Sequence, residues 1–226
     1  MRDFPVFTTE NGAASLVLRE IPYRGVAYIT VQDTLNPKEL LAECVDFCKM
    51  AGAEKIYATG HQWLENYPVY TSVIKMQCPK DSLTESDAAL FPVTEKTIEQ
   101  WRSYYNERMQ NVPGASTMTR EDGKQLLAKG GGYFVHKDGE LLGIGIARED
   151  KIEAIASLKP GAGETVLLSL CSALFAENVV LEVADNNAPA IRLYERLGFL
   201  KTELLRIWYD VNKPSPGGEG VPVGDG

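Results

Sequence analysis

The chain has 226 residues, 44% of them hydrophobic and 24% charged, so it is long enough to bury one or two cores without disulfides or metals. Its formal net charge of −8, from 31 acidic and 23 basic residues, disfavours nucleic acid as a partner and mildly favours a cationic or amine substrate, although solubility explains the charge equally well. No apolar run approaches the ~20 residues of a membrane span, and residues 1–10 lack the basic and apolar regions of a signal peptide. We therefore expect a cytoplasmic protein with no membrane partner.

The first 85 residues alternate strand and helix signals. Asn11-Gly12 separates two strand-like runs, which predicts a hairpin because both positions tolerate positive φ. The expected elements are this hairpin over 5–20, strands at 25–31, 55–60 and 70–77, and an amphipathic helix at 38–53. We expect one α/β unit over residues 1–85.

A second α/β unit is expected over residues 86–212. Residues 78–92 are rich in Pro, Ser, Thr and Asp, which predicts a linker with a boundary near residue 85. The expected elements are helices at 94–110 (capped by Thr94) and 120–130, a hairpin at 132–150, a strand at 151–158, a helix at 164–177, a strand at 178–185, a helix at 188–197 and a strand at 201–211. The Gly- and Pro-rich tail, residues 213–226, has too few apolar residues to order itself, so we predict that it is disordered.

The order of elements occurs twice along the chain. Pro37 and Tyr70 are 33 residues apart, and Pro160 and Tyr194 are 34 apart. This spacing predicts that the N-terminal unit is a degenerate half-copy of the C-terminal one. Two ordinary α/β segments could also show it by chance.

The cysteines do not have the spacing of a metal site. Cys44 and Cys48 lie four apart on one predicted helix, and Cys78 and Cys171 are distant in sequence. The chain contains only two histidines as further ligands. We therefore predict buried, reduced thiols and no metal.

A short glycine loop, "KPGAG" at 159–163, separates the strand at 151–158 from the helix at 164–177. Gly161 and Gly163 allow a sharp turn, and the helix behind them begins with free N–H groups and the positive end of its dipole. This arrangement is typical of an anion cradle. The alternative is that the glycines serve only the geometry of the turn.

The stretch "NNAPAIRLYERLGF" at 186–199 predicts a short helix that begins at an asparagine cap and ends at Gly198. Its apolar stripe consists of Ala190, Leu193, Tyr194 and Leu197. From this pattern alone, Tyr194 is a packed aromatic residue with a polar tip.

Together the loop and this helix carry a family resemblance. The loop is followed by N-x-x-A-x-x-L-Y-x-x-x-G-F, in which the defined positions are Asn187, Ala190, Leu193, Tyr194, Gly198 and Phe199. The pattern closely resembles the signature of the GNAT superfamily of acyl-CoA-dependent N-acetyltransferases, over about residues 90–210. The resemblance implies an α/β fold with a mixed sheet flanked by helices, and acetyl-CoA as co-substrate.

The resemblance also implies roles for individual residues. Tyr194 would point toward the sulfur of the acyl carrier, Asn187 would contact the pantetheine arm, and the loop from Gly161 onward would wrap the pyrophosphate. Backbone carbonyls of residues 156–158 would accept bonds from the pantetheine amides. The implied cofactor-binding set is Ala156, Ser157, Leu158, Lys159, Gly161, Ala162, Gly163, Glu164, Thr165, Asn187 and Tyr194.

For catalysis we expect direct attack of a primary amine on the thioester in a ternary complex. The phenol of Tyr194 can donate a proton to the departing thiolate. Glu153 is our candidate general base, with Glu149 and Asp150 as alternatives. Cys171 lies within an apolar helix, so we do not expect it to act as a nucleophile.

The loop departs from the family pattern, which has Arg or Gln three residues before the first glycine. Leu158 occupies that position and cannot bind phosphate, Pro160 lacks an N–H, and Glu164 would repel an anion. Alternatively, "LKPGAG" is a shortened loop with its proline in the usual place of the family.

Three functions follow. We predict transfer of an acetyl group to a primary amine of a small molecule or peptide. The runner-up is a non-catalytic CoA-binding or protein-interaction module, and the third is a purely structural α/β module. The sequence identifies neither the acceptor nor the oligomeric state.

Overall fold

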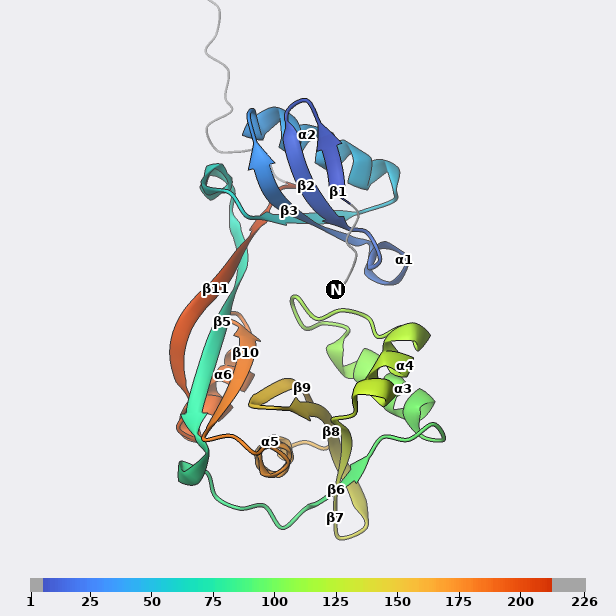
Figure 1. Ribbon diagram of the computed structural model, residues 1–226, viewed down its shortest axis with the longest axis vertical. Helices are drawn as coiled ribbons and strands as arrows, with labels where there is room; N and C mark the ends of the chain where they lie inside the picture. The colour runs from blue at the N-terminus through green and yellow to red at the C-terminus, as the bar shows by residue number, and fades with distance from the viewer. Residues whose placement is uncertain (1–5, 213–226) are drawn as a thin grey trace, which may run out of the picture. The chain divides into compact units, whose positions relative to one another are not determined.

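The structure, a computed structural model, describes residues 6–212 and divides the chain into two compact units (Figure 1). Unit 1 comprises residues 1–72 and 206–226, and unit 2 comprises residues 73–205. Strands β5 (Val69–Pro79) and β11 (Leu200–Asp210) contribute residues to both units. The tail predicted to be disordered, 213–226, lies outside the described residues.

Unit 1 contains an antiparallel hairpin followed by a parallel strand pair. Its elements are β1 (Val6–Thr9), β2 (Gly12–Val17), α1 (Ile21–Arg24), β3 (Val26–Thr34), α2 (Pro37–Met50), β4 (Lys55–Thr59) and the 3-10 helix η1 (Gln62–Asn66). The strand order is β1-β2-β3-β4-β11. Helix α2 connects the parallel strands β3 and β4, and its side chains Leu40, Leu41, Cys44 and Cys48 enter the core of this unit. The predicted hairpin is confirmed, but its turn lies one residue earlier, at Glu10-Asn11, because Thr9 pairs with Gly12, the first residue of β2.

Unit 2 contains the larger part of the sheet. Its elements are η2 (Lys80–Ser82), β6 (Ala89–Pro92), α3 (Ile98–Met109), α4 (Arg120–Lys129), β7 (Gly132–Lys137), β8 (Glu140–Arg148), β9 (Lys151–Ser157), α5 (Gly163–Ser172), β10 (Asn178–Ala184) and α6 (Ala188–Arg196). Together with β5, the strand order is β6-β7-β8-β9-β10-β5. Among these described strands, β9 and β10 pair in parallel, whereas β6 to β9 pair in antiparallel fashion, as do β10 and β5.

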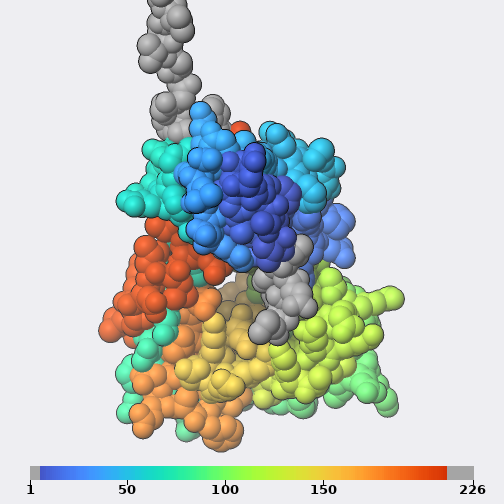
Figure 2. Space-filling model, turned by 45° about the horizontal axis from the view of Figure 1, so that its top comes forward, coloured from blue at the N-terminus to red at the C-terminus, as the bar shows by residue number. Residues whose placement is uncertain are grey.

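Helices cover both faces of this sheet. Phe134 and Ile144 pack with residues of α3 and α4, whereas Val135, the neighbour of Phe134 on β7, packs with α5 and α6 (Figure 1). Successive residues of a strand point to opposite faces, so each core is built from alternate strand positions. The predicted mixed α/β sheet flanked by helices is confirmed. In the space-filling view, the α3–α4 segment in green adjoins the strand segment in gold (Figure 2).

The ladder between β9 and β10 is short. Among the described residues it comprises two pairs, Val180 with Lys151 and Leu181 with Ile152, although β9 continues to Ser157. Glu153, the next residue of β9, is an extra residue between the pairs that Ile152 and Ala154 make with β8, which is a β-bulge. The backbone of β9 beyond the bulge therefore lies free of the β10 ladder, and it leads into the glycine loop and α5.

Unit 1 lacks this feature. Its parallel pair β3–β4 is continuous over five residue pairs, from Val26 with Lys55 to Thr30 with Thr59. Both units nevertheless contain an antiparallel pair, a parallel pair connected by a helix, and a further antiparallel strand. Tyr70 lies on β5 and stacks on Tyr57, with ring centroids 3.7 Å apart, so it is no helical counterpart of Tyr194. The degenerate half-copy stays a prediction.

Three boundaries differ from expectation. The units divide at residue 72 and again at 205, not near 85, because β5 runs unbroken to Pro79 and β6 pairs with β7 inside unit 2. Helix α3 begins at Ile98, since Thr94 forms a preceding turn in which its carbonyl accepts from the N–H groups of Thr97 and Ile98. Helix α5 ends at Ser172, where i→i+3 bonds tighten the chain at Ala173 and Leu174.

Helix α5 packs closely on β8 because two positions of that strand are glycine. A Cβ at Gly145 would lie 2.8 Å from the Ala154 carbonyl oxygen and would overlap the side chain of Leu170. Gly143 has a similar environment, with Val166 above it.

We predict that Gly145→Ala destabilises the protein by about 1–3 kcal/mol, the usual cost of overpacking a core. Urea unfolding measures this change. Leu170→Ala alone should cost about 2–5 kcal/mol because Leu170 is fully buried, but the double variant should lose less than the sum of the two single losses, since shortening that side chain removes one of the two overlaps. Wild-type stability of the single variant would contradict the close packing of α5.

Candidate functional site

A cavity of about 570 Å³ lies where β9, the glycine loop, α5 and α6 meet in unit 2. Its lining residues are Arg108, Ser157, Leu158, Lys159, Pro160, Gly161, Gly163, Glu164, Pro189, Leu193 and Arg196. Most of the loop segment in the predicted cofactor-binding set therefore lines one cavity. Ala156, Ala162, Thr165, Asn187, Tyr194 and the predicted base Glu153 are not among the lining residues.

The loop ends in a helix start that carries no side-chain cap. Gly161 has a φ of 78°, the left-handed region in which glycine is unstrained, and it turns the chain into α5. Ala162 is the N-cap residue of α5 and makes no side-chain cap hydrogen bond. The first N–H groups of a helix have no intrahelical acceptor, so those of Gly163, Glu164 and Thr165 can serve an anion at the positive end of the dipole.

Three cationic side chains surround this helix start. Arg196 binds the Glu164 carboxylate at 2.8 Å, and Lys159 lies 3.4 Å from the Glu140 carboxylate. Arg108 donates from Nη2 to the carbonyl oxygen of Leu158 at 3.1 Å. The repulsion expected from Glu164 is thus offset by Arg196, although such exposed pairs contribute at most about 1 kcal/mol.

Leu158 is a packing residue. Its side chain lies against the core beneath α3 and α4, and its N–H donates to the Leu142 carbonyl at 2.8 Å. The residue at this position therefore holds the loop to the sheet, and its side chain offers nothing to a phosphate.

Tyr194 is almost completely buried. Its side chain is 5% exposed and lies in the core of α5 and α6, with its ring centroid 5.9 Å from that of Phe199. Burial, and to a smaller extent the nearby Cys171 thiol, raises the pKa of Tyr194 to about 12. The phenol therefore stays protonated at neutral pH, which suits a proton donor and excludes a base. Leu193, its neighbour on α6, lines the cavity.

Three further residues considered from the sequence do not line this cavity. Asn187 caps α6, where its side-chain oxygen accepts from the N–H of Ala190 at 3.4 Å. Glu153 is exposed and forms an ion pair with Arg148 at 2.7 Å. Cys171 is buried, and burial raises its pKa to about 12, so its thiol is neutral at physiological pH. The four cysteines are all buried and unpaired, as predicted.

Five lining residues are absent from the predicted set: Arg108, Pro160, Pro189, Leu193 and Arg196. The last three belong to α6, the helix that the signature identifies, so the sequence could have predicted that they lie beside the loop. Arg108 belongs to α3, fifty positions before Leu158, and no local pattern connects the two.

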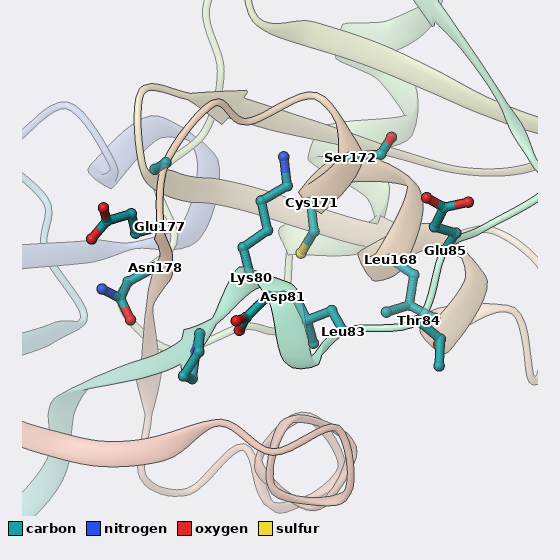
Figure 3. A pocket seen from close by; sticks show the side chains of 12 residues that line it. Lys80, Asp81, Leu83, Thr84, Glu85, Leu168, Cys171, Ser172, Glu177 and Asn178 are labelled. Carbon is teal, nitrogen blue, oxygen red and sulfur yellow. The ribbon is translucent and has the colours of Figure 1, made fainter.

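A second, larger cavity of about 870 Å³ lies at the opposite end of α5 (Figure 3). Lys80 is the only cation among its lining residues, and its ammonium is already bound to the Leu174 carbonyl and lies 5.8 Å from the centroid of Phe175. The carboxylates of Asp81, Glu85 and Glu177 also line it. This cavity does not suit an anionic ligand, despite its size.

Solved structures share the fold of most of this chain. A GCN5-related N-acetyltransferase from Anabaena variabilis is 13% identical, with a TM-score of 0.60 over 88% of this chain and 59% of that protein. A second such acetyltransferase, from Sphaerobacter thermophilus, is 12% identical, with a TM-score of 0.52 over 87% and 75%.

The chain has the GNAT fold. A conserved protein of unknown function from Staphylococcus epidermidis is similar over 93% of this chain and 95% of its own length, at 11% identity and a TM-score of 0.59. The sequence matches no protein-family model and no curated protein. At these identities the similarity establishes the GNAT fold and not the activity. No helix among residues 6–212 is long and apolar enough to cross a membrane.

The raised pKa of Tyr194 predicts a pH dependence of stability. The folded-state pKa of about 12 exceeds the ordinary value of 10, so ionisation favours the unfolded state. The contribution is complete below pH ~10 and is lost as the pH rises toward 12. Between pH 8 and pH 11 the free energy of unfolding should fall in both proteins, and the fall should be about 1 kcal/mol smaller for Tyr194→Phe than for wild type. Equal losses in urea unfolding of the two proteins would contradict the burial of the phenol.

Proposed function

We propose that the protein is an N-acyltransferase that transfers an acetyl group from acetyl-CoA to a primary amine of a small molecule or peptide. The observation that carries the proposal is the cavity at the start of α5. The signature loop lines it, the helix start has no cap, and Arg108, Lys159 and Arg196 surround it.

These residues fit the phosphates of CoA. Phosphate oxygens require N–H donors and positive charge, which an uncapped helix start and neighbouring Arg and Lys side chains supply. The loop from Gly161 to Thr165 would hold the pyrophosphate. The free edge of β9 near Ala156 and Ser157 would bind the pantetheine arm, with Asn187 beside it.

Acetyl-CoA would supply the acyl group as a thioester. Tyr194 donates a proton to the departing sulfur, a role for which its buried, protonated phenol is suited. Glu153 is the proposed acceptor of the amine proton. It stands at the bulge where β9 leaves the β10 ladder, and its ion pair with Arg148 must open for it to act as a base.

A non-catalytic CoA-binding module is the alternative. It is favoured by the finding that Tyr194 and Glu153 do not line the cavity. Release of free thiol from acetyl-CoA in the presence of polyamines, amino acids and aminoglycosides supports the enzyme. Calorimetric binding of CoA without turnover supports the alternative.

Gly163→Asp should abolish donor binding. Gly163 begins α5, and its substitution by Asp puts bulk and negative charge at the pyrophosphate position. We expect acetyl-CoA at ~100 times its Kd to raise the Tm of wild type by about 5 °C or more, and that of Gly163→Asp not at all. Gly163→Asn is the matched control, because it adds similar bulk without charge and should retain part of the shift. If folded Gly163→Asp shows the same Tm increase as wild type, acetyl-CoA binds at another site.

Tyr194→Phe separates catalysis from packing. The variant keeps the buried ring and removes only the hydroxyl, so turnover with the best amine should fall about a hundredfold or more while acetyl-CoA binding is unchanged. Steady-state kinetics and calorimetry on the same preparation measure both effects. Wild-type turnover in Tyr194→Phe would show that the phenol takes no part in the reaction, and that the enzyme acts by positioning the substrates with its backbone groups.

A further inference from the structure

The three cations around the cavity differ in how their charge is compensated. Arg196 and Lys159 each have a carboxylate partner, Glu164 at 2.8 Å and Glu140 at 3.4 Å. Arg108 contacts a neutral carbonyl, that of Leu158. Among the described residues that line the cavity, Arg108 is therefore the cation without a carboxylate partner.

The packing of α3 holds Arg108 above the loop. Trp101 on this helix is fully buried, and its indole N–H donates to the Tyr133 carbonyl at 2.9 Å. Met109, next to Arg108, is buried in the same core against which Leu158 packs. Helix α3 and the loop thus pack against the same hydrophobic core, which holds the backbone of Arg108 beside the cavity.

The guanidinium is suited to a phosphate. It stays charged at all physiological pH values and carries several N–H donors in one plane, of which the bond to Leu158 uses one. The remaining donors can form the paired hydrogen bonds that arginine makes with phosphate oxygens. The side chain of Leu158 carries no charge. Arg108, on α3, therefore supplies next to the loop the positive charge that the loop lacks at position 158.

We propose that Arg108 is the residue that recognises the phosphates of the acyl donor and so selects CoA over phosphate-free thioesters. The inference rests on the proposed donor site. It assigns to α3 a binding role in addition to packing, and it makes donor affinity depend on a residue outside the signature.

The test is calorimetric titration of Arg108→Gln with CoA and with pantetheine, which lacks the phosphates. We expect CoA affinity to fall about tenfold or more, the usual effect of losing a charge-assisted hydrogen bond, and its salt dependence to weaken. Affinity for pantetheine should be unchanged. Arg192→Gln is the matched control, since Arg192 is an exposed arginine of α6 that does not line the cavity, and CoA affinity should change less than about twofold.

The outcomes separate this inference from the function. If wild type binds CoA and Arg108→Gln binds it equally well, the role of Arg108 is wrong and the donor site stands. If Arg108→Gln weakens CoA and pantetheine equally, Arg108 only supports the loop, and its recognition of phosphate is wrong. If wild type does not bind CoA at all, the proposed function fails and this inference with it.

Discussion

The short ladder between β9 and β10 is the constraint on which the candidate site depends. Two residue pairs join these parallel strands, and the bulge at Glu153 then takes β9 out of the ladder. Backbone groups that would otherwise be paired become available next to the start of α5. Gly143 and Gly145 allow α5 to approach β8 closely, which fixes that start. In unit 1 the β3–β4 ladder is continuous, and α2 begins at Pro37 beside hydrogen-bonded Asn11 and Asn36. The described residues of unit 1 therefore contain neither the opening nor the glycine loop.

Charge decides between the two cavities, not volume. The larger cavity has three carboxylates, and its single lysine is already bound to a carbonyl. The smaller one combines uncapped helical N–H groups with three cations, and its own carboxylate, Glu164, is paired with Arg196. An overall net charge of −8 therefore coexists with a local site for an anion, because the field at the cavity is set by the few groups within a Debye length of about 10 Å.

Features set by neighbouring residues were predictable from the sequence, whereas features set by long-range packing were not. The hairpins over 5–20 and 132–150, the Asn187 cap and the glycine loop depend on local backbone preferences, and the structure contains each of them. The contact between Arg108 and Leu158 depends on how α3 packs on the sheet, and no spacing encodes it. The boundary near residue 85 was wrong for a related reason. A linker-like composition did not reveal that residues 89–92 form β6 and pair with β7.

Hydrogen–deuterium exchange with and without CoA tests most directly where the donor binds. The account predicts that CoA slows exchange at residues 157–166 and at the start of α6, since these backbone groups surround the smaller cavity. Exchange at 80–85 and 172–178, which line the larger cavity, should not change. Protection confined to the larger cavity, or no protection at 157–166 in the presence of bound CoA, would contradict the central claim.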